Sequence, residues 1–173
     1  MKDYWLAKLI SSVAEVDSRK RLQKSIYLLQ LSGCPLRCAY LLHYYGPYSF
    51  ELAGLIDQLI GAKIIKETPD QIAQGVVRYR STITEPGKIA LAHFENSQEG
   101  QRLHTEITPF VEIFRELSKE DAWVLELAAT AAFYHRDNWD NAQERTAHFK
   151  KLGLGDGNLK KAVDLARRFK ESA

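Results

Sequence analysis

The sequence has few of the residues that would place it in a specialised class of protein. Its 173 residues include two cysteines, ten glycines and five prolines, which excludes a disulfide-rich scaffold and argues against a disordered chain. No apolar run approaches the roughly 20 residues needed to cross a bilayer, and Glu126 interrupts the most apolar stretch, residues 122–134. The 24 basic and 22 acidic residues give a formal net charge of +2, so a polycationic nucleic-acid coat is excluded as well.

The N-terminal residues lack the long apolar segment and the small-residue cleavage site of a secretory leader. We therefore expect a cytoplasmic protein that does not bind membranes. In a reducing compartment Cys34 and Cys38 are expected to be buried free thiols. The alternative is a metal or redox site, but only His43 stands near the pair, and a zinc site needs further ligands. No metal and no cofactor are expected.

The order of predicted elements in the first hundred residues is that of a winged helix-turn-helix. Apolar periodicity indicates helices, and alternation bounded by turn residues indicates strands. The predicted loop inside the hairpin is roughly eight to ten residues long. The elements are helices at residues 3–16, 19–32 and 50–61, an extended segment at 39–45, hairpin strands at 63–66 and 76–83, and a helix after Thr84.

From Arg102 onward the pattern is helical throughout, with helices predicted to Leu117 and at residues 122–135, 140–151 and 158–171. Thr108-Pro109 either begins the first of these helices or kinks a longer one. Residues 118–121 resemble a capping box that has Asp in place of the usual Glu. We predict a mostly α (α+β) fold. Its winged-helix-like core with a small β-hairpin spans residues 1–100, and a C-terminal helical bundle, 101–173, packs on it.

The helix predicted at residues 50–61 stands where a winged-helix protein carries its recognition helix. Major-groove readers use basic and amide side chains on bases and phosphates. Residues 47–61 contain no Lys or Arg, and the outward positions are Glu51, Gly54, Asp57 and Gln58. The two carboxylates would be repelled by phosphates, so this helix is a poor DNA reader.

Basic side chains elsewhere keep DNA binding open as the alternative function. Strand alternation places Arg78 and Arg80 on one face of the wing. Arg19 and Lys20 begin the helix at 19–32, where the macrodipole disfavours cations. Such a placement indicates either an anionic neighbour or a solvated face. These four residues are the candidate nucleic-acid contacts.

Aromatic residues gather between residues 40 and 50. Tyrosine is favoured at protein interfaces because it buries a large area at low entropic cost and keeps a polar tip. We expect two or three members of the cluster to be core residues and Tyr48 to be the most exposed. The cluster consists of Tyr40, Tyr44, Tyr45, Tyr48 and Phe50.

Two motifs carry a family resemblance. The segment 19–24 (RKRLQK) with Tyr27, followed by 45–49 (YGPYS) with Glu51-Leu52, resembles the YwgA-like family of uncharacterised bacterial proteins. With the stretch 125–129 this likeness covers most of the chain. Over residues 19–65 the sequence is also similar, more loosely, to the Panacea or SocA-type antitoxin domain. The resemblance implies a winged-helix-like core with C-terminal helices and a role in protein contacts rather than catalysis.

The residues predicted to contact a partner come from these motifs and from the aromatic cluster. Gly46-Pro47 fixes a turn and Ser49 can cap a helix, so part of the second motif is structural. The candidate partner-binding residues are Gln23, Lys24, Tyr45, Tyr48 and Glu51.

The sequence shows no set of residues that indicates an enzyme. The five histidines are scattered, and none stands at metal-ligand spacing from another. Residues 153–158 are rich in glycine, but no strand precedes them, so a turn between helices is favoured over a phosphate loop. Glu126 within its apolar helix is expected to pair with an internal Lys or Arg. We predict a non-enzymatic protein-interaction module, antitoxin-like or regulatory, that binds another protein or a second copy of itself. The alternative is a DNA-binding transcriptional regulator.

Overall fold

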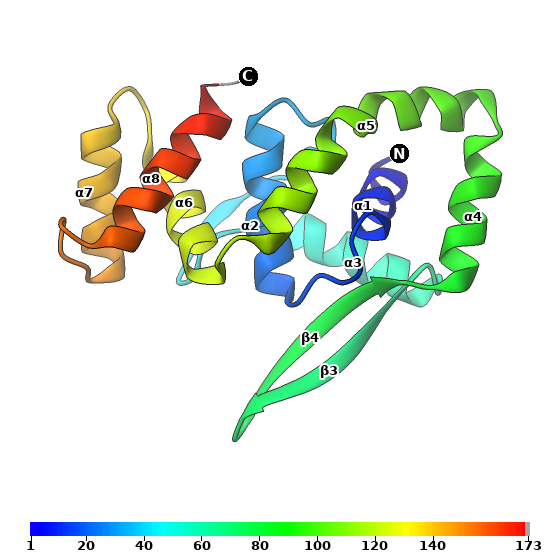
Figure 1. Cartoon of the computed structure of the whole chain (residues 1–173), viewed down its shortest axis with the longest axis horizontal. Coiled ribbons are helices and arrows are strands. Elements are labelled where there is room, and N and C mark those ends of the chain that lie inside the picture. Colours follow the sequence, from blue (N-terminus) through cyan, green and yellow to red (C-terminus); the bar gives the residue numbers. More distant parts are fainter. Residues whose placement is uncertain (172–173) are drawn as a thin grey trace.

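The computed structural model describes residues 1–171, and in that part of the chain it has eight helices and two antiparallel two-stranded hairpins (Figure 1). The predicted mostly α (α+β) fold is confirmed. The elements are α1 (Lys2–Ser11), α2 (Arg19–Leu31), β1 (Leu41–His43), β2 (Gly46–Tyr48), α3 (Phe50–Gly61), β3 (Ile65–Ala73), β4 (Val76–Ile83), α4 (Glu85–Glu95), α5 (Gln98–Lys119), α6 (Ala122–Tyr134), α7 (Trp139–Lys150) and α8 (Gly157–Lys170).

Helix α2 lies at the centre of the molecule and packs against α5, α6 and α8 (Figure 1). All residues from Leu22 to Leu29 are buried, so this helix is enclosed for two turns. The buried residues form one contiguous core that runs from α1 to α8. Residue 100, the predicted domain boundary, lies inside α5, and residues 172–173 of the predicted C-terminal part lie outside the described chain. Pro109 also lies inside α5, so it does not begin a separate helix.

Polar side chains start most of the helices by accepting a backbone N–H. Ser18 caps α2, and Ser49 caps α3 as predicted. The predicted capping box at residues 118–121 is corrected: Asp121 itself caps α6 and accepts from the N–H groups of Trp123 and Val124. Asp prefers the cap because its carboxylate satisfies two otherwise unpaired donors.

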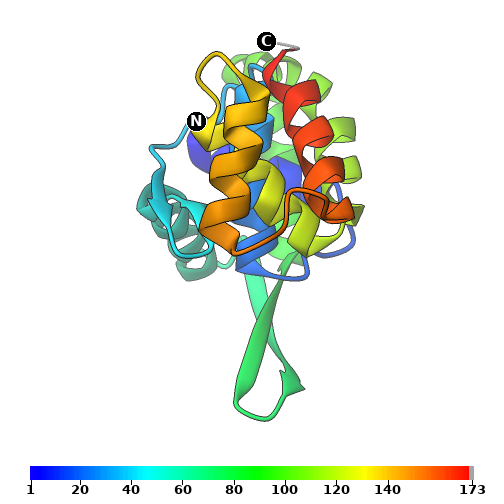
Figure 2. The ribbon, with the colours of Figure 1, turned by 90° about the vertical axis from the view of Figure 1, so that its left-hand side faces the viewer.

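The β3–β4 hairpin projects away from the helical body (Figure 2). The predicted long loop is wrong, because the strands continue to Ala73 and Val76 and a two-residue turn with Gly75 at φ +74° joins them. Pro69 lies within β3 opposite Tyr79. A two-stranded ribbon has an open edge on each strand, where a missing N–H is tolerated, so the proline does not end the strand.

The β1–β2 hairpin is short and is held between helices. The predicted extended segment at 39–45 contains β1, but Gly46-Pro47 belongs to β2 and the turn consists of Tyr44 and Tyr45. Gly46 has φ +84°, and a Cβ atom there would lie 2.6 Å from Thr130 Oγ1 of α6. Glycine at position 46 therefore permits both the backbone conformation and the close approach to α6.

Candidate functional site

The two sequence motifs meet where α2 contacts the β1–β2 hairpin. The Gln23 side-chain amide donates from Nε2 to the Ser49 carbonyl oxygen at 2.9 Å, and the Ser49 N–H donates back to Gln23 Oε1 at 2.9 Å. The Lys24 ammonium donates to the Pro47 carbonyl oxygen at 2.6 Å. Gln23 and Lys24 are each 2% exposed. These motif residues therefore fix the hairpin on α2.

Three lysines surround one buried glutamate beside this contact. Glu126, 2% exposed, forms ion pairs with Lys150 and, at 2.8 Å, with Lys20. The expected pairing of Glu126 with internal cations is confirmed. Lys150 also donates to the Tyr44 carbonyl oxygen at 3.1 Å, which ties α7 to the hairpin turn. Burial lowers the pKa of Lys24 to about 8; Glu126 opposes this, whereas Lys150 and Lys20 add to it.

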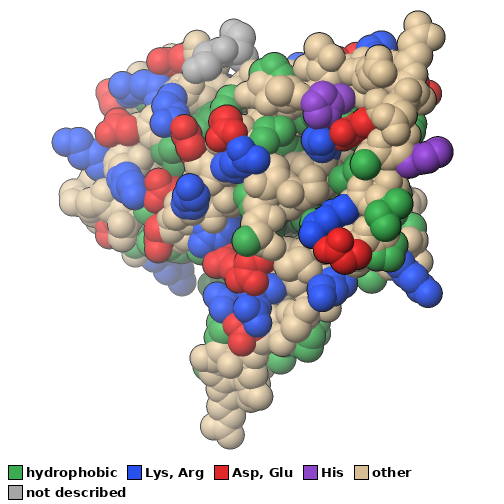
Figure 3. All heavy atoms as spheres, turned by 45° about the vertical axis from the view of Figure 1, so that its right-hand side comes forward, with side chains coloured by type: hydrophobic (Ala, Val, Ile, Leu, Met, Phe, Trp, Pro, Cys, Tyr) green, Lys and Arg blue, Asp and Glu red, His purple; other side chains and the backbone are tan. Residues whose placement is uncertain are grey.

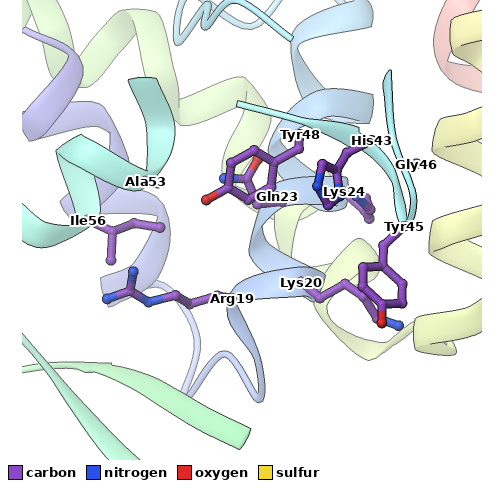
Figure 4. Close-up of a pocket in the computed structure, with 10 residues that line it drawn as sticks. All are labelled: Arg19, Lys20, Gln23, Lys24, His43, Tyr45, Gly46, Tyr48, Ala53 and Ile56. Atoms are coloured by element: carbon purple, nitrogen blue, oxygen red, sulfur yellow. The ribbon is translucent and has the colours of Figure 1, made fainter. Parts of the chain in front are cut away.

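A pocket of about 190 Å³ opens between α2, the β1–β2 hairpin and α3. Figure 4 shows Arg19 and Ile56 on one side and Lys20 and Tyr45 on the other. Lys24 also lines the pocket, and within the described chain no Asp or Glu does. The walls are largely aromatic and apolar.

Rings from the hairpin shape the wall of this pocket. His43 lies 5.9 Å from the Tyr48 ring and 6.4 Å from the Tyr45 ring, measured between centroids. Lys20 Nζ lies 5.5 Å from the Tyr45 centroid, a cation–π contact. Sequence reasoning did not select His43, although it belongs to the hairpin itself. It also did not select Thr130 or Lys150, because only the tertiary fold brings α6 and α7 to the hairpin.

Next to the pocket, apolar side chains face solvent. Leu41 is 66% exposed, Tyr44 75%, Tyr45 54% and Phe50 71%. We refer to these four residues as the hairpin surface. The prediction that Tyr48 would be the most exposed of the cluster is wrong: it is half-buried, and its ring contacts Phe50 at 5.0 Å. Phe50, the first residue of α3, is exposed, whereas Leu52 two residues later is fully buried.

Two of the five aromatic residues, Tyr40 and Tyr48, are partly buried and the other three are exposed, so the prediction that two or three would be core residues is wrong. Tyr40 stacks edge-on against Tyr27 at 4.8 Å and donates its hydroxyl to the Gln23 carbonyl oxygen at 3.2 Å. Burial raises the pKa of Tyr40 well above its ordinary value. Tyr40 therefore supports α2, whereas Tyr44 and Tyr45 occupy the turn.

Glu51, another predicted partner contact, is exposed but already has local partners. Its carboxylate forms an ion pair with Lys2 of α1 and accepts from the Ala39 N–H at 3.1 Å. The contact with Lys2 is the main cause of its lowered pKa. Glu51 therefore connects the start of α3 to α1 and to the segment before β1. The outward positions predicted on α3 are confirmed: Gly54, Asp57 and Gln58 are exposed as well.

The four candidate nucleic-acid contacts are all engaged in ion pairs. Their partners are Glu67 and Asp57 for Arg19 (2.8 Å each), Glu126 for Lys20 (2.8 Å), Asp70 for Arg78 (2.6 Å) and Glu15 for Arg80 (3.4 Å). Arg19, Lys20 and Arg78 line a common groove at the base of the β3–β4 hairpin. Acidic and basic side chains are interspersed over the face of the molecule that Figure 3 shows.

Neither cysteine is among the residues that line the pocket. Cys34 and Cys38 are buried free thiols, as predicted. Burial raises the pKa of Cys34 to about 12 and that of Cys38 to about 11. Both therefore stay protonated and unreactive at neutral pH.

Residues 1–171 contain no helix whose length and apolar content would suit it to crossing a membrane. Within the same range no group of His, Cys, Asp and Glu side chains has the arrangement of a metal site.

Comparison with known proteins gives one informative likeness. The chain is similar to YwgA. It is 36% identical over 88 residues to the uncharacterized protein YwgA of Bacillus subtilis (strain 168). The matched segment is 51% of this chain and 52% of YwgA, so the chain spans about half the length of this curated relative. No protein-family model matches the chain. The likeness to YwgA agrees with the resemblance in the sequence motifs, and the looser similarity to the Panacea or SocA-type domain stays a prediction.

Proposed function

We propose that the chain is a non-enzymatic protein-interaction module that binds its partner through the hairpin surface. The observation that carries this proposal is the exposure of Leu41, Tyr44 and Tyr45 on the short, firmly held β1–β2 hairpin and of Phe50 at the start of α3. Contiguous apolar side chains in solvent are costly and typically mark an interaction site. Tyrosine and phenylalanine are the residue types enriched at the centres of such sites.

The attachment of the hairpin supports the same proposal. Gln23, Lys24 and Lys150 donate to backbone carbonyls in the turn and in the segment that follows it, those of Ser49, Pro47 and Tyr44 respectively. A surface held in this way loses little conformational entropy on binding, so more of the contact energy appears as affinity. The motif residues thus act by positioning the hairpin surface, and Tyr45 is the predicted partner contact that this surface exposes.

The order of elements supports a winged-helix-like core. Val16, between α1 and α2, pairs with Ser81 of β4 through two backbone hydrogen bonds of 2.9 Å, which adds a minimal third strand to the β3–β4 hairpin. Helix α3 then takes the position of a recognition helix, and its exposed face carries Asp57 and Glu51. This charge, together with the ion pairing of Arg19, Lys20, Arg78 and Arg80, favours protein binding over DNA binding.

The class of partner in this proposal rests on the looser similarity to the Panacea or SocA-type antitoxin domain. An antitoxin-like or regulatory protein would use the hairpin surface to bind a toxin-like or regulated protein in the cytoplasm. A second copy of the chain is the competing occupant, and the mass of the purified protein in solution separates the two.

Affinity capture with matched variants tests the proposal. Tyr44→Ser with Phe50→Ser removes two exposed rings, whereas Ile89→Ser removes an isolated apolar side chain of α4 with 70% exposure, close to the 71% of Phe50. We expect the double variant to lose a partner that wild type and Ile89→Ser both retain. A partner retained equally by all three proteins would contradict the proposal.

A further inference from the structure

The pocket beside the hairpin surface has an imbalance of charge. Arg19, Lys20 and Lys24 line it, and in the described chain no carboxylate does. Two of the three have carboxylate partners that do not line the pocket: Arg19 pairs with Asp57 and Glu67, and Lys20 pairs with Glu126. Lys24 has none among the residues described: its ammonium contacts only the neutral carbonyl of Pro47. Two of its three N–H donors are therefore not used by that contact.

Glu126 supplies only part of the missing charge, because it forms no ion pair with Lys24 and its carboxylate is shared between two other lysines. One oxygen faces Lys150 and the other faces Lys20. Three lysines around one glutamate leave a formal surplus of two positive charges in a region where Lys24, Lys150 and Glu126 side chains are nearly inaccessible to water. Buried charges of one sign are expensive unless they are paired. An anion in the pocket would offset that cost.

The residues of the pocket wall other than its three cations indicate which chemical group the anion has besides its charge. Tyr45, Tyr48 and His43 present rings, and Ile56 presents an aliphatic side chain. Such walls bury the apolar body of a ligand, while a few polar groups orient its charged end. The volume of about 190 Å³ lies below the roughly 300–1,000 Å³ typical of drug-sized ligands, so the ligand is small.

We propose that this pocket binds a small organic anion. Its carboxylate or phosphate group contacts Lys24 and Lys20, and its apolar or aromatic body lies against Tyr45, Tyr48 and Ile56. The lowered pKa of Lys24 agrees with a buried cation that lacks a counter-charge. This inference does not depend on the protein-interaction proposal, since the pocket would bind its ligand whether or not the hairpin surface contacts a partner. Tyr45 lines the pocket and also belongs to the hairpin surface, so a ligand in the pocket would contact one residue of that surface.

Titration of the full chain with defined probes tests the inference. Benzoate and phenyl phosphate carry the two forms of anionic group on one ring, and benzyl alcohol is their neutral counterpart. Binding is followed through the backbone amide resonances of residues 43–48 and by calorimetry. We expect one of the two anions to bind in the millimolar range or tighter and to shift these resonances, whereas benzyl alcohol binds about tenfold more weakly or worse. The anion that binds identifies the charged group.

Two variants locate the binding. Lys24→Met removes the unpaired cation, and Ala53→Leu narrows the pocket from α3 without changing any charge. Each should weaken binding of the anion by about tenfold or more, whereas Lys88→Met on exposed α4 should leave it unchanged. The inference is overturned if neither anion shifts the resonances of residues 43–48 at millimolar concentration, or if a folded Lys24→Met protein binds as wild type does.

Discussion

The Gln23 side-chain amide and the Ser49 backbone form a closed pair of hydrogen bonds, each 2.9 Å long. Ser49 also accepts the Leu52 N–H through its hydroxyl and so begins α3. A single buried side chain of α2 therefore fixes the end of the β1–β2 hairpin and the start of the next helix. This arrangement explains why the two motifs occur together in one sequence.

Gln23→Glu should destabilise the fold although the two side chains have the same shape. The new oxygen faces the Ser49 carbonyl oxygen, and the site is closed to water. We expect the free energy of unfolding to fall by about 2–4 kcal/mol, measured by urea denaturation. Gln58→Glu, on the exposed face of α3, is the matched control and should change it little. Equal effects of the two substitutions would show that the amide pair has no structural role.

Gly46→Ala should lower the free energy of unfolding more than the same substitution at another glycine with positive φ. Both Gly46 and Gly33 have φ near +90°, but only at Gly46 would the Cβ atom collide, 2.6 Å from Thr130 Oγ1. We expect Gly33→Ala to cost about 1 kcal/mol and Gly46→Ala about 2–4 kcal/mol in thermal or urea unfolding. Adding Thr130→Ala should recover part of the loss at Gly46 alone. The absence of any recovery would mean that the contact with α6 is not the cause.

The burial of Lys24 should appear in the dependence of stability on pH. Its pKa is about 8 in the fold and 10.5 as the ordinary value, so the unfolded chain binds more protons between these two values. The contribution of Lys24 to the free energy of unfolding is therefore lowest below pH 8, and it increases as the pH rises to 10.5. Glu126 on α6, Lys150 on α7 and Lys20 on α2 face the same region and remain in both proteins compared here.

We compare wild type with Lys24→Met across that range. The difference in unfolding free energy, wild type minus variant, should rise by roughly 2–3 kcal/mol between the two pH limits. The exposed Lys88→Met variant should show no such rise. A difference that stays constant with pH would mean that Lys24 is not desolvated.

Duplex DNA should bind weakly at most, since the arginines of the wing and of α2 are paired with acidic groups. We expect no salt-dependent association with duplex DNA at low ionic strength, measured by fluorescence anisotropy, and no change on replacing Arg78 and Arg80 by Ala. Strong binding at low salt that these substitutions abolish would instead favour the transcriptional-regulator alternative.

Local sequence patterns predicted much of this fold. The features that they did not predict depend on tertiary contacts. Ser18 and Ser49 were recognisable as helix caps, and the outward face of α3 followed from helical periodicity. The first hairpin strand was predicted to end at residue 66, with Pro69 in the loop, because the position of this proline in a free-standing ribbon is not visible in the sequence. Tyr48 was expected to be the most exposed ring of the cluster, and its contact with Phe50 is not visible in the sequence.

The candidate site was predictable only in part. The motifs identified Gln23 and Lys24, but nothing in the sequence showed that they would be enclosed and turned toward the hairpin backbone. Lys150 and Thr130 stand more than eighty residues from the hairpin, so their place beside it depends on the packing of α6 and α7. Glu126 was identifiable as a buried charge, whereas its partners were not.

Site-specific photo-cross-linking tests the central claim most directly. Benzoylphenylalanine placed at Tyr44, which is 75% exposed on the hairpin surface, is compared in the native host with the same residue at Ile89, which is 70% exposed on α4. The proposal predicts a discrete cross-linked protein from position 44 and none from position 89. No cross-link at position 44, or the same products from both positions, would contradict it.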